Sequence, residues 1–139
     1  MTRITRSTDP SHATTPPGKA ALWGGRVLSF LVVAMLVMSA SMKLTGGAEV
    51  TAGLDHLGFT SDKLAILAAL ELTCVLLYLV PHTAVLGAVL VTGYLGGAMS
   101  VHLRVGEPVH VPLLLGIVAW AGLYLREPRL RRLLPLRSV

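Results

Sequence analysis

Four long apolar runs, joined by short polar segments, make up most of the chain. They cover residues 22–44, 64–80, 84–103 and 109–125. About 20 helical residues cross roughly 30 Å of hydrocarbon, and these runs approach that length with few charged side chains. The pattern therefore predicts an all-α integral membrane four-helix bundle. A cleaved signal peptide is the alternative interpretation of the first run, but that run is longer than a typical signal core, which favours a retained helix.

The polar segments predict the rest of the domain organisation. Residues 45–62 carry Val50, Leu54 and Leu57 at near-helical spacing, which predicts a short interfacial helix in the first outer loop. Residues 1–20 are rich in Ser, Thr and Pro, so we expect a disordered cytoplasmic tail. Residues 21–126 then form the four-span transmembrane domain, and residues 127–139 form a basic cytoplasmic tail.

Composition and charge support a membrane location. Hydrophobic residues make up 53% of the 139 positions and charged residues 14%, below the quarter that is typical of soluble domains. Four spans place both termini on one side, together with nine of the 12 basic residues; Lys43, Lys63 and Arg104 fall on the other side. The positive-inside rule then predicts a multi-pass protein of the cell inner membrane with both termini in the cytoplasm. The aromatic residues expected to act as anchors near the cytoplasmic ends of the spans are Trp23, Tyr78, Trp120 and Tyr124.

The net charge of +5 does not indicate a nucleic-acid partner. The basic residues lie mainly at the two chain ends, and no basic surface interleaved with aromatic side chains is predicted. The chain has one cysteine, Cys74, so it lacks the thiol pair of a disulfide-exchange enzyme. We expect Cys74 to be a small buried filler.

Glu71 is the residue that the pattern singles out most clearly. It lies about 10 Å into the hydrocarbon if the second span begins at Leu64, where a bare carboxylate costs several kcal/mol. We expect it to face the bundle interior with a partner, Lys43 or Tyr94 first and His102 as a third candidate. Its role is either a polar clamp between helices or a proton-relay, ligand or quinone-headgroup contact. Lys43 has the further alternative of extending outward to the interface.

Two further groups of residues invite a specific interpretation. His56, His102, Arg104 and His110 reach the same outer face, but they form no tight ligand motif, so no metal site is predicted. The second group consists of small residues in the third span. We expect Gly93, Gly96 and Gly97 to serve helix packing, within the bundle or between two copies of the chain.

Several segments together resemble the DoxX-like family of small bacterial four-helix membrane proteins. They are Met-Lys-Leu-Thr-Gly at 42–46, His-Leu-Gly-Phe at 56–59, Glu-Leu at 71–72, Leu-Val-Thr-Gly-Tyr-Leu-Gly-Gly-Ala at 90–98 and His-Leu-Arg-Val-Gly at 102–106. The similarity runs from about Gly25 to Leu125. It implies an interior polar site at the positions where the family keeps polar residues, namely Lys43, Glu71, Tyr94, His102 and Arg104. The wider family is linked to thiosulfate:quinone oxidoreductase as a membrane subunit, which implies quinone contact, although no cofactor motif is evident in the chain.

Three functions follow as hypotheses. The first is a non-catalytic membrane scaffold or partner subunit, which predicts a well-packed core without a pocket. The second is the membrane subunit of a quinone-linked redox complex, which predicts a lipid-accessible pocket near Glu71, Tyr94 and His102. The third is a small proton or solute carrier, which predicts a water-filled cavity that reaches Glu71. No catalytic residue is assigned, so we do not expect an enzyme acting alone; the expected partners are membrane lipids, membrane or peripheral redox proteins, and a second copy of the chain.

Overall fold

The computed structural model describes residues 18–133, which are helical and contain no strand, in agreement with the all-α prediction. The helices are α1 (Lys19–Thr45), α2 (Ala48–His56), α3 (Ser61–Leu79), α4 (Ala84–Arg104), α5 (His110–Arg126) and α6 (Pro128–Leu133). The predicted tail at 1–20 lies almost wholly outside the described residues, as do residues 134–139 of the second tail. Each of the four apolar runs forms one helix, and α2 forms where the first loop was expected to contain a helix.

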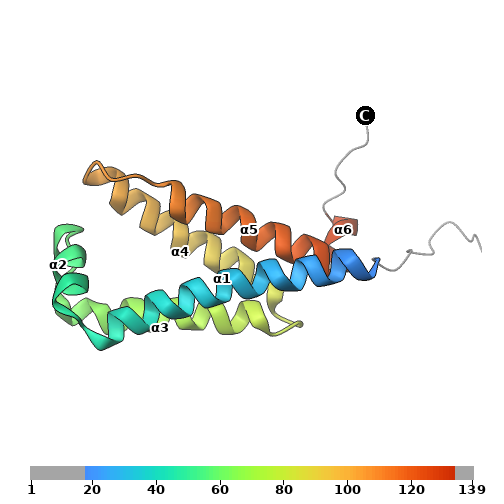
Figure 1. The fold of residues 1–139 in the computed structure, drawn as a ribbon, viewed down its shortest axis with the longest axis horizontal. Helices are drawn as coiled ribbons and strands as arrows, with labels where there is room; N and C mark the ends of the chain where they lie inside the picture. Colours follow the sequence, from blue (N-terminus) through green and yellow to red (C-terminus); the bar gives the residue numbers. More distant parts are fainter. Residues whose placement is uncertain (1–17, 134–139) are drawn as a thin grey trace, which may run out of the picture.

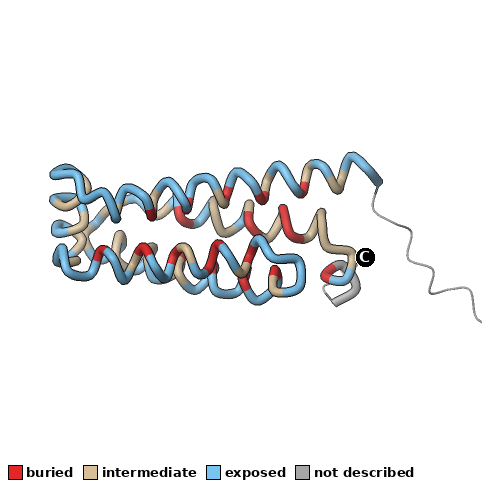
Figure 2. Tube along the Cα trace, turned by 90° about the horizontal axis from the view of Figure 1, so that it is seen from below, coloured by how far each residue is buried: buried red, intermediate tan, exposed pale blue. Residues whose placement is uncertain are grey.

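The four long helices lie side by side along the length of the molecule (Figures 1 and 2). Helix α1 packs against α3 and α5, and α4 packs against the same two helices, so α1 and α4 face each other diagonally. Figure 1 shows that the α4–α5 pair and the α1–α3 pair diverge toward the end where α2 lies. We call this the α2 end; the opposite end, where α1 begins and α5 finishes, is the terminal end.

Two of the helices are long and apolar enough to cross a membrane, namely α1 and α4. Helix α5 is equally apolar but only 17 residues long, and α3 carries Asp62, Lys63 and Glu71 within its 19 residues. The outer surface is apolar: Phe30 is 72% exposed, whereas Glu71 is 1% exposed. This distribution of polarity is the reverse of that in a water-soluble helical domain.

Glycine brings the helix backbones together at the terminal end. A Cβ atom added at Gly25 would lie 2.8 Å from both the Gly122 carbonyl oxygen and the Arg126 amide nitrogen, so α1 and α5 touch backbone to backbone. A Cβ atom at Gly87 would lie 2.2 Å from the amide nitrogen of Tyr78, which shows the same close approach between α4 and α3. Only residues without side chains permit such contacts.

The side chain of Tyr78 is buried at the terminal end, where it joins α3 to α1 and α5. Its predicted role as an interface anchor is therefore wrong. The side chain is 1% exposed, and its hydroxyl donates to the Ala119 carbonyl at 2.8 Å while lying 3.0 Å from the hydroxyl of Ser29. Arg126 donates to the Tyr78 carbonyl at 2.7 Å, and its guanidinium lies 4.8 Å from the centre of the tyrosine ring. The cause is helical register: Tyr78 follows Glu71 by seven residues and shares its inward face.

The glycines of the third apolar run do not pack against another helix. A Cβ atom added at Gly93, Gly96 or Gly97 would meet nothing within 4 Å among the described residues, so the prediction of intramolecular packing at these positions is wrong. The physical reason is the divergence of the two helix pairs, because these glycines lie in the half of α4 where the α1–α3 pair has moved away (Figure 1). The residues that do pack closely are Gly25, Gly87 and Gly122.

The first residues of the predicted basic tail at 127–139 form a short helix that packs against the other helices. Glu127 is extended (φ −112°, ψ 100°), as expected for a residue before proline, and this ends α5. Pro128 then starts the short helix α6, a position that tolerates its missing amide hydrogen. Leu130 is buried in the hydrophobic core, which fixes α6 to the bundle.

Candidate functional site

A pocket of about 570 Å³ lies where the helix pairs diverge at the α2 end. Four long helices and the α2 segment all contribute to its wall, and most of the lining is aliphatic or methionine. The polar side chains in the lining are Ser39, Lys43, Glu71, Tyr94 and His102. The volume falls within the range of small-molecule sites, which are typically apolar with a few convergent polar groups.

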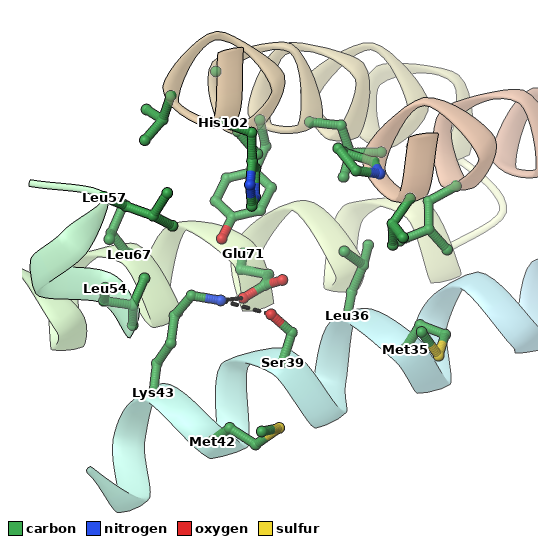
Figure 3. Close-up of a pocket in the computed structure, with 18 of the residues that line it drawn as sticks. Met35, Leu36, Ser39, Met42, Lys43, Leu54, Leu57, Leu67, Glu71 and His102 are labelled. Atoms are coloured by element: carbon green, nitrogen blue, oxygen red, sulfur yellow. Dashed lines mark hydrogen bonds and ion pairs between the residues drawn. The ribbon is translucent and has the colours of Figure 1, made fainter. Parts of the chain in front are cut away.

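Lys43 and Glu71 form an ion pair inside this pocket. The Lys43 Nζ lies 2.9 Å from Oε2 of Glu71, and the two side chains are 11% and 2% exposed. The ammonium also donates to the Ser39 hydroxyl, one turn earlier on α1, at 2.6 Å. Lys43 therefore turns inward from near the end of α1 rather than outward (Figure 3). A carboxylate buried to this degree requires such a partner, since its desolvation is otherwise not compensated.

Tyr94 approaches the same carboxylate from α4. Its side chain lines the pocket together with Lys43 and Glu71, so α1, α3 and α4 each contribute a polar side chain to it. Of the two partners that the sequence predicted first, Lys43 pairs directly with Glu71, and Tyr94 lines the same pocket. The centre as a whole carries no net charge, because the lysine and the glutamate neutralise each other.

His102 lies on the same wall as Tyr94, two residues before the end of α4. Figure 3 shows its ring pointing from α4 toward the Lys43–Glu71 pair. Its Nδ1 lies 2.8 Å from Oε2 of Glu107, and Oε1 of Glu107 lies 3.6 Å from Nε2 of His56 on α2. Glu107 was not among the predicted site residues, because it lies in the polar segment between the third and fourth apolar runs; the available signal was an acidic residue just beyond His102 in a short connection.

Arg104 is the one nominated residue that does not line the pocket. Its guanidinium donates to the Leu57 carbonyl at 2.6 Å and lies against Gly58, whose φ of +85° suits a residue without a side chain. The physical reason is its position as the last residue of α4, where the side chain reaches across to the α2–α3 connection. Arg104 therefore holds the α2–α3 connection, which borders the pocket, against the end of α4. It does not contact the pocket interior.

The apolar part of the pocket was not foreseen from the sequence. Met35, Met38 and Met42 line it from α1, and methionine side chains adapt to irregular apolar surfaces. Helix α2 adds Val50 and Leu54, the same apolar face that predicted this helix. The remaining residues of the apolar lining are Leu36, Leu57, Phe59, Leu67, Gly93, Leu95, Gly97, Ala98, Val101, Val111, Pro112 and Leu115.

The side chains of the described region do not converge on a metal. No group of three or more His, Cys, Asp and Glu residues within 18–133 is arranged to hold one. His110 is exposed at the start of α5 and is not part of the pocket lining. Cys74 is buried among the apolar core residues without a second thiol nearby, consistent with a filler role.

The pocket combines a polar end with an apolar body, an arrangement that matches the shape of an amphiphilic molecule. One end of the pocket offers an ammonium, a carboxylate, a phenol, a hydroxyl and an imidazole, whereas the body offers flexible apolar side chains. In the comparison with known proteins, the family model described as the DoxX-like family matches residues 27–122. No curated protein and no solved structure shows a significant match to the chain.

Proposed function

The chain belongs to the DoxX-like family, which is membrane-associated, and we propose that it is a four-span membrane protein that binds a small amphiphilic molecule between its helices. In this proposal it acts as a partner or binding subunit and has no catalytic activity alone. The amphiphile places its head group at the Lys43–Glu71 pair and its tail along the methionines of α1.

Two observations support four membrane crossings. The long helices lie side by side and present an apolar outer surface, although only α1 and α4 meet the length and composition expected of a span by themselves. Of the charged residues of α3, Asp62 and Lys63 lie in its first turn, and Glu71 turns inward to an ammonium and so does not meet lipid. In this proposal α2 lies at the membrane surface, and both termini are in the cytoplasm of a cell with the protein in its inner membrane.

The observation that carries the proposal is the pocket itself. A scaffold that only stabilises an assembly predicts a filled core, whereas about 570 Å³ remains open beside a buried ion pair. The apolar side chains that line a space of this size gain van der Waals contacts when an apolar tail lies against them.

The redox subunit is the second candidate, supported by the composition of the polar end. Lys43, Tyr94 and His102 converge on one point of an otherwise apolar pocket, an arrangement that fits the carbonyl groups of a quinone. In that role the chain supplies the quinone contact and a partner protein supplies the redox centre. Purification in mild detergent followed by identification of the associated proteins distinguishes this candidate from a ligand-binding protein without partners.

The proposed function is tested by filling the pocket without disturbing the fold. Gly97 lines the pocket and has open space beside it, so Gly97→Leu inserts a side chain into the ligand's volume. Gly96→Leu is the matched control, since Gly96 also has open space but does not line the pocket. Native mass spectrometry of protein extracted in mild detergent should show bound lipid-like molecules in the wild type and in Gly96→Leu and little in Gly97→Leu. Equal occupancy in all three proteins would contradict the proposal.

A further inference from the structure

The imidazole of His102 offers the polar end of the pocket a hydrogen-bond acceptor. Nδ1 of His102 lies 2.8 Å from the Glu107 carboxylate. A carboxylate only accepts hydrogen bonds, so Nδ1 must carry the proton and donate it. In the neutral imidazole Nε2 is then an acceptor, and it lies at the far side of a ring that points into the pocket (Figure 3).

The same end also offers a hydrogen-bond donor. The Lys43 ammonium has three N–H bonds, of which Ser39 takes one and Glu71 takes another. The third N–H has no protein partner within the described part of the chain. A ligand head that fills this end therefore meets an acceptor on α4 and a donor on α1.

The charged residues around the pocket argue against anionic and quaternary ammonium head groups. The positive charge of Lys43 is already neutralised by Glu71, and the next charged group, Glu107, is itself acidic. An anionic head would lie near two carboxylates without a free cation. A quaternary ammonium has no proton to offer Nε2 of His102, and the carboxylate of Glu71 already has its counterion.

We infer that the pocket selects an uncharged amphiphile with a hydroxyl head group, which donates to Nε2 of His102 and accepts from the Lys43 ammonium. This inference rests on the proposed function, because it specifies the ligand of the same pocket. A hydroxyl is the smallest group that both donates and accepts. Glu107 acts as a positioning residue, since its carboxylate fixes which ring nitrogen of His102 faces the ligand.

Three probes with the same ten-carbon tail test this assignment. They are 1-decanol, decyl methyl ether, which accepts but cannot donate, and decanoate, which is anionic. Native mass spectrometry in mild detergent measures the occupancy of each probe, with Gly97→Leu as the background for tail adhesion. The wild type should bind 1-decanol about fivefold to tenfold better than the ether, the equivalent of one neutral hydrogen bond, and should bind decanoate weakest.

Two variants of His102 tie the preference to its ring. His102→Phe keeps the aromatic volume but removes both nitrogens, so the alcohol and the ether should bind equally. His102→Gln retains an acceptor and should keep part of the preference for the alcohol. If His102→Phe does not fold, the ratio of 1-decanol to decyl methyl ether bound by the wild type still tests the assignment of a hydroxyl head group.

The outcomes separate the two claims. If the wild type binds all three probes equally well, the pocket binds amphiphiles and the assignment of a hydroxyl head is overturned. If no probe binds above the background of Gly97→Leu, the proposed function itself fails. A preference for 1-decanol that persists unchanged in His102→Phe overturns the role of His102 alone, because another group must then accept the proton.

Discussion

Replacing Lys43 and replacing Glu71, the two partners of the buried ion pair, should lower the stability of the protein by different amounts. Lys43→Met leaves the Glu71 carboxylate without its counterion at 2% side-chain exposure. Removal of one partner of a buried pair costs about 3–5 kcal/mol, because the remaining charge is uncompensated. Glu71→Leu leaves the Lys43 ammonium with Ser39 and with a flexible stem that can carry it outward. We expect this second change to cost less, about 1–3 kcal/mol.

The double variant measures the interaction itself. When Lys43→Met and Glu71→Leu are combined, no buried charge is left, and apolar replacements of similar volume are often neutral or stabilising. The double variant should therefore be more stable than Lys43→Met alone. The assay is the free energy of unfolding in mixed micelles, measured by titration with a denaturing detergent for all four proteins of the cycle.

A matched control shows that the effect depends on burial. Lys63→Met removes an ammonium that is 56% exposed and pairs with the exposed Asp62 at 2.6 Å. Ion pairs at such an exposed surface contribute little to stability, so this variant should unfold like the wild type. If the effects of Lys43→Met and Glu71→Leu simply add in the double variant, the two residues are not coupled and the reasoning about this pair is refuted.

Three further predictions concern packing and topology. Gly25→Ala should lower stability by about 1–3 kcal/mol because its Cβ meets the backbone of α5, whereas Gly97→Ala should not; equal melting temperatures in detergent would contradict this difference. Tyr78→Phe should lower stability by about 1–3 kcal/mol, since the Ala119 carbonyl loses its buried donor; an unchanged unfolding profile would show that water replaces it. A reporter fused after Val139 should be active only as a cytoplasmic fusion and one inserted in α2 only as a periplasmic fusion; the opposite pattern would reverse the proposed topology.

The helices could be predicted from the sequence because a polar segment separates each apolar run from the next. The helix starting at Ala84 begins where its apolar run begins, and Glu71 was expected to face inward because a buried carboxylate requires a partner. These inferences depend only on local pattern and on the energy of a charge in an apolar medium.

The close helix contacts and the apolar lining of the pocket could not be predicted in the same way. Gly93 and Gly97 have the spacing of a packing motif, yet Gly25 and Gly122 make the contact, because the divergence of the helix pairs decides which glycines meet a neighbour. That divergence is a property of the whole bundle and has no local signature. Glu107 was missed for a similar reason, since its partners His102 and His56 belong to different helices that meet only in the folded chain.

Photo-crosslinking tests the central claim, that an amphiphile occupies the pocket, most directly. Decyl amphiphiles with a diazirine in the tail, one with a hydroxyl head and one with a carboxylate head, are added to the protein in lipid nanodiscs. After irradiation, peptide mass spectrometry identifies the labelled residues, with excess unlabelled amphiphile as competitor. We predict competable labelling of Met38, Leu67 and Val101, which line the pocket. Labelling confined to outward-facing residues such as Leu86 and Ile117, without competition, would contradict it.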